Sequence, residues 1–451
     1  MLFSRDEIIH KFGPIFFDYD EESVELYYDG ERFDLTDGES AAALVEKSIE
    51  KKDYEISKVA NNFLAVHEVR SNCVRYTHYP VMMHIELSDF CNCECIMCKH
   101  CYEKNSNAKR LPREAFLELE RFFITCKIVI INGYGEPLIH PDISEIISVF
   151  EKYGVKLFTT TNLQRIPENC FDQINKVFAR INVSCDGACA KTYESIRRRA
   201  SFDTFVRNVT TLREKCPDVQ LFMSVCIMRQ NIEEAVELVR LAKRLGFEEI
   251  RFGRLGSNQF IENEHDELIF YPNYAEYMLN LARLEGEKTG IRVVTPLIMR
   301  DNDISLEKAE AEREQLHETP FFRDEEFYQA LSETYRQLKT RQKFDYHLYS
   351  TDGTISCQGM CHWIGYGIYI NSSGKVRPCS EVPNNRAQEK TDETVDYNHE
   401  ELLTFRRCFI SGRVPAVCMD CAFIMSDEIG CLKVNLDEYK KFFQEKAGRA
   451  D

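Results

Sequence analysis

The chain has 451 residues, 44% of them hydrophobic and 29% charged, which is typical of a globular protein with room for two or three domains. Its formal net charge of −17 argues against nucleic acid or an anionic membrane as the main partner, since either would bind a basic face. Residues 1–14 are too charged for a signal peptide, and no stretch approaches the roughly 20 apolar residues of a membrane span. The 19 cysteines therefore predict a cytoplasmic protein whose thiols are reduced or ligate metal.

Residues 1–78 are predicted to fold as a small α+β unit. Strands are expected at residues 15–19, 24–28 and 32–35, and helices at 40–51 and 54–66. Asp29-Gly30 separates the second strand from the third and predicts a tight turn. The simplest interpretation of this unit is a cap on the domain that follows it.

Strands and helices alternate from residue 79 to residue 295. Strands are expected at 81–87, 127–131, 155–160, 180–184, 220–226 and 249–252. The helices between them repeat apolar residues at a 3.6-residue period, as in Ile143, Ile146 and Phe150. Six such units with right-handed crossovers predict an α/β fold, a parallel sheet curled into a partial (β/α)6 TIM-like barrel. Binding residues are expected at the C-terminal ends of its strands.

Two further regions follow the predicted barrel. Residues 296–345 are strongly charged with a helical pattern, which favours a solvated helical linker over a substrate lid. Residues 346–451 are rich in cysteine, and a hairpin is expected at 365–378 with its turn at Asn371-Ser-Ser-Gly374.

The motif Cys91-Asn-Cys-Glu-Cys95-Ile-Met-Cys98 directly follows the first barrel strand. Read as C-x3-C-x2-C, it offers three thiolates from one loop, and a [4Fe–4S] cluster held by three cysteines keeps one iron open. The motif resembles the signature of the radical S-adenosylmethionine (SAM) superfamily. The resemblance implies that SAM binds the open iron and is cleaved reductively to a 5′-deoxyadenosyl radical, with a flavodoxin- or ferredoxin-type electron donor. Cys93 and Cys101 could be spare ligands, but the spacing favours Cys91, Cys95 and Cys98.

A glycine-rich segment, Ile131-Asn-Gly-Tyr-Gly-Glu-Pro137, ends the second barrel strand. Glycine lets a backbone approach a ligand where a Cβ would clash. The segment resembles the family's Gly-Gly-Glu motif, which implies that Gly133, Gly135 and Glu136 lie near the SAM amino group. Asn162 ends the third strand at the place of the family's Thr-Asn-Gly, with Leu163 instead of the glycine.

The fourth strand ends in Val183-Ser-Cys-Asp-Gly187, which is similar to a Val-Ser-x-Asp-Gly motif of the family. Ser184 and an arginine of 197–199, represented by Arg197, would suit the SAM carboxylate because hydroxyl and guanidinium groups donate to it. For the arginines a solvated helix face is the competing interpretation. Cys185 and Cys226 could return a hydrogen atom to a substrate radical, although buried cysteines more often serve packing.

Four cysteines near the C-terminus form a second set, Cys361, Cys379, Cys418 and Cys421. Four thiolates with a C-x2-C half could hold structural zinc. After a radical SAM barrel they resemble the SPASM extension in its shortened twitch form, which implies one auxiliary [4Fe–4S] cluster. The roles of Cys357, Cys408 and Cys431 stay open.

A fully ligated auxiliary cluster suits an electron acceptor, which favours two-electron oxidation of a small polar molecule such as a sugar or cyclitol alcohol. The alternative is a maturase that cross-links or epimerises a ribosomally made peptide. Residues 1–78 support the alternative, because their order of strands then helices resembles peptide-recognition domains ahead of some peptide-modifying radical enzymes. A third hypothesis, a non-catalytic iron–sulfur or zinc protein, is disfavoured because a carrier needs no SAM pocket.

Overall fold

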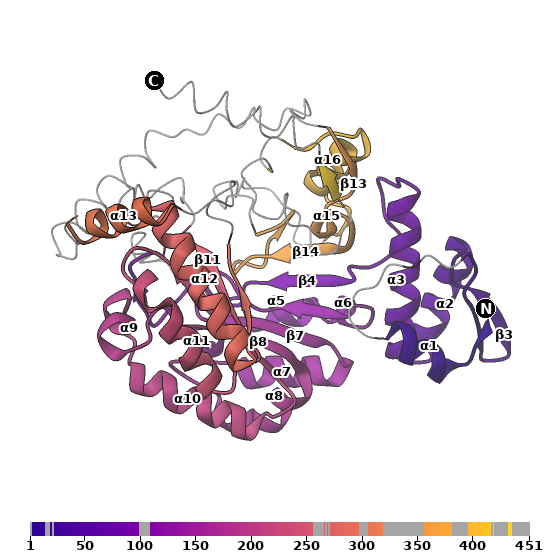
Figure 1. Ribbon diagram of the computed structural model, residues 1–451. Coiled ribbons are helices and arrows are strands. Elements are labelled where there is room, and N and C mark those ends of the chain that lie inside the picture. The colour runs from indigo at the N-terminus through magenta and orange to yellow at the C-terminus, as the bar shows by residue number, and fades with distance from the viewer. Residues whose placement is uncertain are drawn as a thin grey trace.

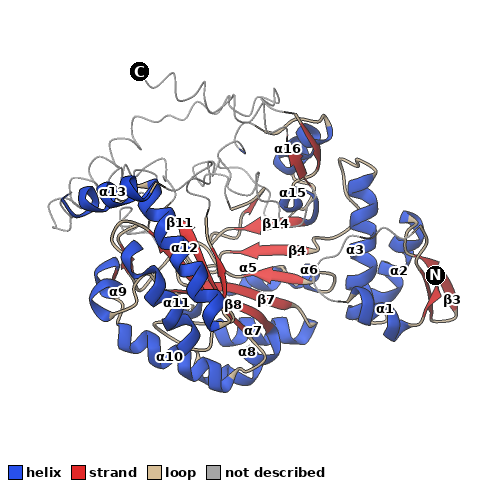
Figure 2. Ribbon diagram, viewed as in Figure 1, coloured by secondary structure: helices blue, strands red, loops and turns tan. Residues whose placement is uncertain are grey.

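The computed structural model describes residues 2–13, 19, 22–98, 109–255, 266, 268, 271–296, 305–318, 356–380, 396–415, 418 and 432–434. Its largest element is a nine-stranded sheet with helices packed along one side (Figure 1, Figure 2). No helix in these ranges is both long and apolar enough to cross a membrane.

All six predicted strands of the α/β region form. They are β4 (Met82–Ile85), β6 (Ile128–Ile130), β7 (Lys156–Thr161), β8 (Phe178–Ser184), β10 (Gln220–Ile227) and β11 (Glu249–Arg254). They lie side by side in chain order, and every neighbouring pair is parallel. A seventh parallel strand that was not predicted, β12 (Arg292–Val294), pairs with β11. The α/β class is therefore confirmed.

Helices connect these strands and bury one apolar face each. They are α5 (Arg113–Glu118), α6 (Glu120–Phe123), α7 (Ile143–Tyr153), α8 (Phe171–Val177), α9 (Ala190–Ile196), α10 (Phe202–Lys215), α11 (Ala235–Arg244) and α12 (Pro272–Thr289). In α7 the predicted face of Ile143, Ile146 and Phe150 is buried. Gly154 ends this helix in the left-handed region at φ 60°, which glycine adopts without steric cost.

Successive residues of a strand point to opposite faces of the sheet. In β8, Ile181 and Val183 belong to the apolar core, so Arg180, Asn182 and Ser184 lie on the other face. We call this second face, which is more polar, the inner face of the sheet. The candidate site occupies the C-terminal edge of the inner face.

The N-terminal unit contains β1 (Leu2–Phe3), α1 (Arg5–Phe12), β2 (Glu25–Tyr28), β3 (Glu31–Asp34), α2 (Gly38–Glu50) and α3 (Tyr54–Arg70). The predicted hairpin is confirmed: β2 and β3 are antiparallel, and Asp29 and Gly30 have φ values of 49° and 82°. The strand expected at 15–19 lies outside the described residues except Tyr19, which is in no strand. Helix α1 was missed, although Ser4 and Glu7 form a capping box at its start.

Helix α3 joins the N-terminal unit to the main sheet. Every residue from Ile56 to Val66 is buried, so the helix is covered on all sides. Lys58 Nζ donates to the carbonyl of Gly154 at 2.7 Å and also to that of Tyr153. Lys127, just before β6, donates to the carbonyl of Phe12 at 2.6 Å. These contacts lie at the N-terminal ends of the strands, away from the candidate site.

The predicted C-terminal hairpin forms from β14 (Gly367–Ile370) and β15 (Val376–Arg377). Unexpectedly, it extends the main sheet, because β14 pairs in parallel with β4. Beside it lie α15 (His362–Tyr366) and α16 (Glu400–Ile410), with the two-stranded sheet of β13 (Cys357–Gly359) and β16 (Leu432–Val434). The hairpin is therefore not part of a sheet of its own.

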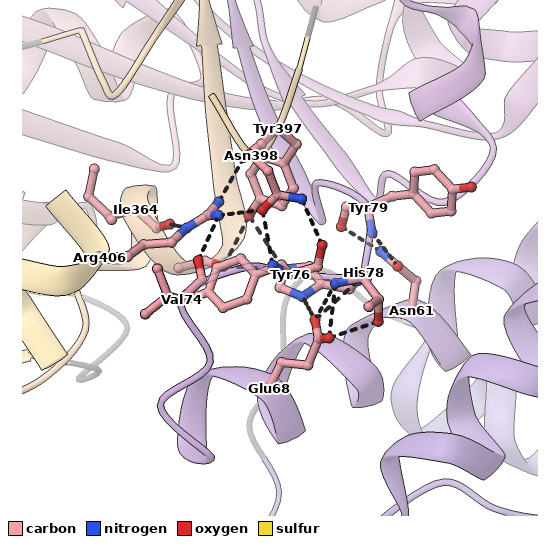
Figure 3. Close-up of polar contacts among 12 residues, drawn as sticks. Asn61, Glu68, Val74, Tyr76, His78, Tyr79, Ile364, Tyr397, Asn398 and Arg406 are labelled. Atoms are coloured by element: carbon pink, nitrogen blue, oxygen red, sulfur yellow. Dashed lines mark hydrogen bonds and ion pairs between the residues drawn. The ribbon is translucent and has the colours of Figure 1, made fainter. Parts of the chain in front are cut away.

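A buried carboxylate fastens the segment that leads into β4 (Figure 3). Glu68 accepts hydrogen bonds from the Thr77 amide at 2.9 Å, the Thr77 hydroxyl at 2.7 Å and His78 Nδ1 at 2.5 Å. Burial would raise the pKa of Glu68, but these hydrogen bonds and the His78 ring lower it to about 2. On the other side of the ring, His78 Nε2 lies 3.2 Å from the carbonyl of Gly365.

Arg406 of α16 binds the C-terminal part to the same segment (Figure 3). Its fully buried guanidinium donates to Asn398 Oδ1 at 2.9 Å, the Tyr397 carbonyl at 3.0 Å and the Ile364 carbonyl at 3.2 Å. Its Cζ lies 3.9 Å from the ring centroid of Tyr76 and 4.6 Å from that of Tyr397. Hydrogen bonds and cation–π contacts thus replace a counter-charge at this joint.

The linker prediction needs a correction. Of residues 296–345, the structure describes 296 and 305–318, and α13 (Leu306–Glu318) is not simply solvated. Its Ala309 and Leu316 are buried, and Glu312 accepts hydrogen bonds from Asn273 and the Tyr274 amide of α12. The helix is charged on one face and packs with the other.

Candidate functional site

The three predicted ligand cysteines lie on one loop that leaves the C-terminal end of β4. The amide of Cys98 donates to the carbonyl of Cys95 at 3.0 Å, which closes a turn between them. Cys95 belongs to β5 (Glu94–Cys95), which pairs antiparallel with β9 (Arg197–Arg198) and places Cys95 opposite Arg197. The fourth β/α unit therefore holds the cysteine loop in place.

The glycine-rich segment packs against this loop from the other side. The Gly135 amide donates to the carbonyl of Ser88 at 3.1 Å, and the Glu136 amide donates to that of Phe90 at 2.9 Å. A Cβ on Gly135 would lie only 2.3 Å from the Ser88 carbonyl oxygen. Glycine is required here for the approach of two backbone segments, so the close contact expected with a ligand is made within the protein.

Glu136 is buried and its carboxylate is already engaged. It accepts hydrogen bonds from the Thr161 hydroxyl at 2.6 Å, the Asn162 amide at 2.7 Å and the Leu138 amide at 3.2 Å. Burial raises the pKa of Glu136 against the effect of these donors. The carboxylate therefore ties the glycine segment to the end of β7.

Asn162 and Cys93 direct N–H groups toward the sulfur of Cys91. Asn162 Nδ2 lies 3.7 Å from Cys91 Sγ and donates to Asn92 Oδ1 at 2.8 Å. The backbone amide of Cys93 donates to Cys91 Sγ at 3.4 Å. Hydrogen bonds from Cys93 lower the pKa of the Cys91 thiol, which favours the thiolate that ligates iron.

Arg197 is buried and faces the same loop. Its Nε lies 2.7 Å from Asp186 Oδ2 in an ion pair, and its Nη1 lies 3.8 Å from Cys95 Sγ. The solvated helix face considered for this arginine is therefore wrong. The structure does not describe a contact of Arg197 with Ser184, its expected partner in binding the SAM carboxylate.

Strand alternation separates the two cysteines considered as hydrogen donors. Cys185 is fully buried in the core on the helix side, and burial raises its pKa to about 12. Cys226 and Ser224 alternate with core residues of β10 and lie on the inner face, where Ser224 is level with Ser184. Cys226 packs against a small apolar cluster that includes Ile96 of the cysteine loop. Of these two thiols, only Cys226 lies on the side of the candidate site.

Glu86 is a residue of the site that sequence reasoning missed. Its buried carboxylate accepts from the Tyr134 amide at 2.8 Å, the Ser372 amide at 3.2 Å and the Tyr369 hydroxyl at 3.3 Å. A Cβ on Gly133 would lie 2.4 Å from its side chain. Glu86 thus joins the glycine segment to the C-terminal hairpin, and a glutamate at the end of an apolar strand was the available signal.

The second cysteine set is described in part. Cys361, Cys379 and Cys418 are partly buried and pack against the main apolar core, and Cys421 lies outside the described residues. Cys357 and Cys408 are buried beside each other, in β13 and α16. The set of four therefore stays a prediction.

The donor chemistry of the first loop fits an iron–sulfur cluster. Among the described residues, no three His, Cys, Asp or Glu side chains gather as the ligands of one metal ion. In a [4Fe–4S] cluster each cysteine binds a different iron, so its thiolates surround a larger body. Three cysteines on one loop, with N–H groups directed at two of their sulfurs, match that requirement.

Sequence comparison agrees with this geometry. Residues 85–242 match the model of the radical SAM superfamily. The mycofactocin maturase MftC of Mycolicibacterium smegmatis is 30% identical over 178 residues, which cover 37% of this chain and 43% of that protein. The AdoMet-dependent heme synthase of Methanosarcina barkeri is 26% identical over 176 residues, covering 38% of this chain and 50% of that protein. The chain thus spans at most half the length of these two relatives.

Among solved structures, Streptococcus suis SuiB bound to S-adenosylmethionine aligns with a TM-score of 0.49 and 14% identity, covering 89% of this chain and 88% of that one. The matched domain of the radical SAM family contains the cysteine loop, the glycine segment and Arg197. From the loop and this match together, residues 85–242 are a radical SAM domain, and the superfamily that it belongs to uses a [4Fe–4S] cluster and SAM as cofactors.

Proposed function

We propose that this radical SAM enzyme modifies a ribosomally made peptide, by cross-linking or by epimerisation. The observation that best supports radical chemistry is the three-cysteine loop, which is held between the glycine segment and β9 inside the matched domain. The peptide substrate is supported by the mycofactocin maturases of several mycobacteria, which are 29–31% identical over 178 residues. Oxidation of a sugar or cyclitol alcohol, expected first from the sequence, has less support from these relatives.

Cys91, Cys95 and Cys98 would hold the cluster through their thiolates. When bound, the cluster would supply the electron for reductive cleavage of SAM, and with it the radical chemistry that removes hydrogen from an unactivated C–H bond of the substrate. Gly135 and Glu136 brace the cysteine loop through their amides, which keeps the thiols oriented before any cofactor binds. Such preorganisation is what a reactive site requires of its protein.

The inner face beside the loop offers the SAM-binding groups. Asn162 and Ser184 carry an amide and a hydroxyl at the C-terminal ends of neighbouring strands. Both can donate to a carboxylate or ribose oxygen. We include Gly133 because it lies beside Glu86, and Arg197 because its guanidinium lies beside the cysteine loop, with Nη1 3.8 Å from Cys95 Sγ.

The finer architecture is part of the same proposal. The parallel sheet would form a partial TIM-like barrel, and residues 346–451 would be a SPASM or twitch extension that holds one auxiliary [4Fe–4S] cluster. Cys361, Cys379 and Cys418 support this through their shared position against the core, with Cys421 as the fourth ligand. Residues 1–78 would be either a cap or a peptide-recognition unit, and the burial of α3 supports the cap.

Two measurements test the function. Simultaneous replacement of Cys91, Cys95 and Cys98 by alanine should remove about four irons per chain and abolish 5′-deoxyadenosine formation under dithionite. If this variant still cleaves SAM, the assignment of the radical site is wrong.

The substrate class is tested by co-expression with any short reading frames that are found beside the gene. A peptide that loses two hydrogens indicates cross-linking, and one that gains a single deuterium in heavy water without another mass change indicates epimerisation. If none of these peptides changes, while a polyol is oxidised by the purified enzyme, the peptide proposal is wrong.

A further inference from the structure

Arg197 lies where it can act on the cluster itself. The backbone ladder that places it opposite Cys95 continues through a hydrogen bond from the Ile96 amide to the Ile196 carbonyl at 2.9 Å. On the outer side, Arg199 forms an ion pair with Glu94 at 3.0 Å. Any movement of the Arg197 backbone would therefore move the loop that carries Cys95.

The guanidinium of Arg197 is fixed by a buried counter-charge. Asp186 is fully buried and 2.7 Å from Arg197 Nε, while Arg197 itself is 8% exposed. The other carboxylate oxygen of Asp186 accepts from the Cys226 amide at 2.7 Å. Because β10 holds this carboxylate by its backbone, the direction of the guanidinium is set by the sheet and not by the loop.

The remaining edge of the guanidinium faces a ligand sulfur. Arg197 Nη1 lies 3.8 Å from Cys95 Sγ, and the chain neighbours Ile96 and Ile196 belong to a buried apolar cluster with Met228 and Leu255. A positive charge and N–H donors beside a cysteine sulfur stabilise the more negatively charged, reduced cluster. The apolar surroundings strengthen that effect, because they screen charge poorly.

We propose that Arg197 is a positioning residue that orients Cys95 and raises the reduction potential of the cluster, and that Asp186 moderates this effect. The inference rests on the proposed cluster site. It gives Arg197 a role in the absence of SAM, beyond the contact with the SAM carboxylate expected from the sequence.

Removing the charge of Arg197 and removing the charge of Asp186 should shift the midpoint potential of the cluster in opposite directions. Arg197→Gln removes the positive charge and leaves the buried Asp186 carboxylate near the cluster, so the midpoint potential should become more negative. Asp186→Asn keeps the guanidinium and removes its counter-charge, so the potential should become more positive. Arg199→Gln is the matched control, because Arg199 is two residues away and its side chain is 68% exposed.

The experiment is an anaerobic redox titration of the reconstituted cluster without SAM, followed by electron paramagnetic resonance, together with iron content and SAM affinity. In Arg197→Gln the ratio of reduced to oxidised cluster at a fixed potential should fall at least about tenfold, which is about 59 mV for one electron. Asp186→Asn should raise this ratio above that of the wild-type protein, and Arg199→Gln should leave it unchanged. Arg197→Lys should give a ratio between those of Arg197→Gln and the wild-type protein.

Unchanged potentials in Arg197→Gln and Asp186→Asn, with weaker SAM binding, would overturn the inference and leave Arg197 as a SAM ligand. If Arg197→Gln does not retain iron, the potentials of Asp186→Asn and Arg197→Lys still show whether the guanidinium raises the midpoint potential. Failure of the proposed radical site gives a different result, since the triple cysteine variant would then keep all of its iron and its SAM cleavage.

Discussion

Replacing Arg406 by methionine should loosen the C-terminal part from the sheet. The substitution removes four hydrogen bonds of 2.9–3.4 Å from a charged donor, each worth at most about 1.5–3 kcal/mol, and contacts with two aromatic rings. One of these bonds, to the Val74 carbonyl, and the contact with the Tyr76 ring reach the segment that leads into β4. Against this loss, methionine avoids the cost of burying a charge, which amounts to several kcal/mol. The net destabilisation expected is therefore about 3–5 kcal/mol, in the range found when a buried charged group loses its network.

Amide hydrogen exchange of the cluster-loaded protein measures this effect locally. Exchange in 362–370 should accelerate in Arg406→Met, since Arg406 binds the carbonyl of Ile364 and the turn at Tyr397 and Asn398. The control is Arg407→Met, whose side chain is 51% exposed and paired with Glu400 at 2.6 Å. An exposed pair of this kind contributes about 0–1 kcal/mol. Equal exchange in the two variants would refute the role assigned to Arg406.

Three further outcomes are expected. Gly135→Ala should lose iron from the loop, because its Cβ would meet the Ser88 carbonyl. The control Gly30→Ala, with open space at φ +82°, should lower the free energy of unfolding by about 1 kcal/mol and keep its iron. Equal iron content in both variants would contradict the argument that two backbone segments need glycine at position 135. Glu68, with its pKa lowered to about 2, should contribute up to about 3 kcal/mol to the free energy of unfolding above pH 4.5, and this contribution should be lost as the pH falls toward 2. Urea titrations at several pH values should show this dependence in the wild-type protein and not in Glu68→Gln. Cys379→Ala should abolish product but still cleave SAM, and a variant with full turnover would exclude an auxiliary cluster at that cysteine.

We expect the outcome of the proposed radical step to depend on which thiol faces the substrate. Oxidation was expected from the sequence, with Cys185 and Cys226 both dispensable. Cys226 lies on the inner face near Ile96, so it alone of the two is placed to return a hydrogen atom. If the product gains carbon-bound deuterium in heavy water and Cys226→Ala abolishes that gain, the enzyme is an epimerase. If no deuterium appears and Cys226→Ala keeps its turnover, an oxidative outcome is supported.

The sequence by itself determined the elements and the kind of chemistry. Alternating apolar strands and amphipathic helices require a parallel sheet, since each element must bury one face. The spacing of Cys91, Cys95 and Cys98 is a local property of one loop, and it indicated the family before any contact was known. The turn at Asp29-Gly30 could be predicted for the same reason, because its φ values concern only neighbouring residues.

Only the tertiary structure decided which distant residues meet. The pairing of β14 with β4 and the bridge of Glu86 to Ser372 join segments almost 290 residues apart, and no local pattern specifies such a partner. Likewise, a single arginine in 197–199 could be solvated or buried by its sequence alone. Its meeting with Asp186 follows from the register of β8, β9 and β10, which is set by packing across the whole sheet.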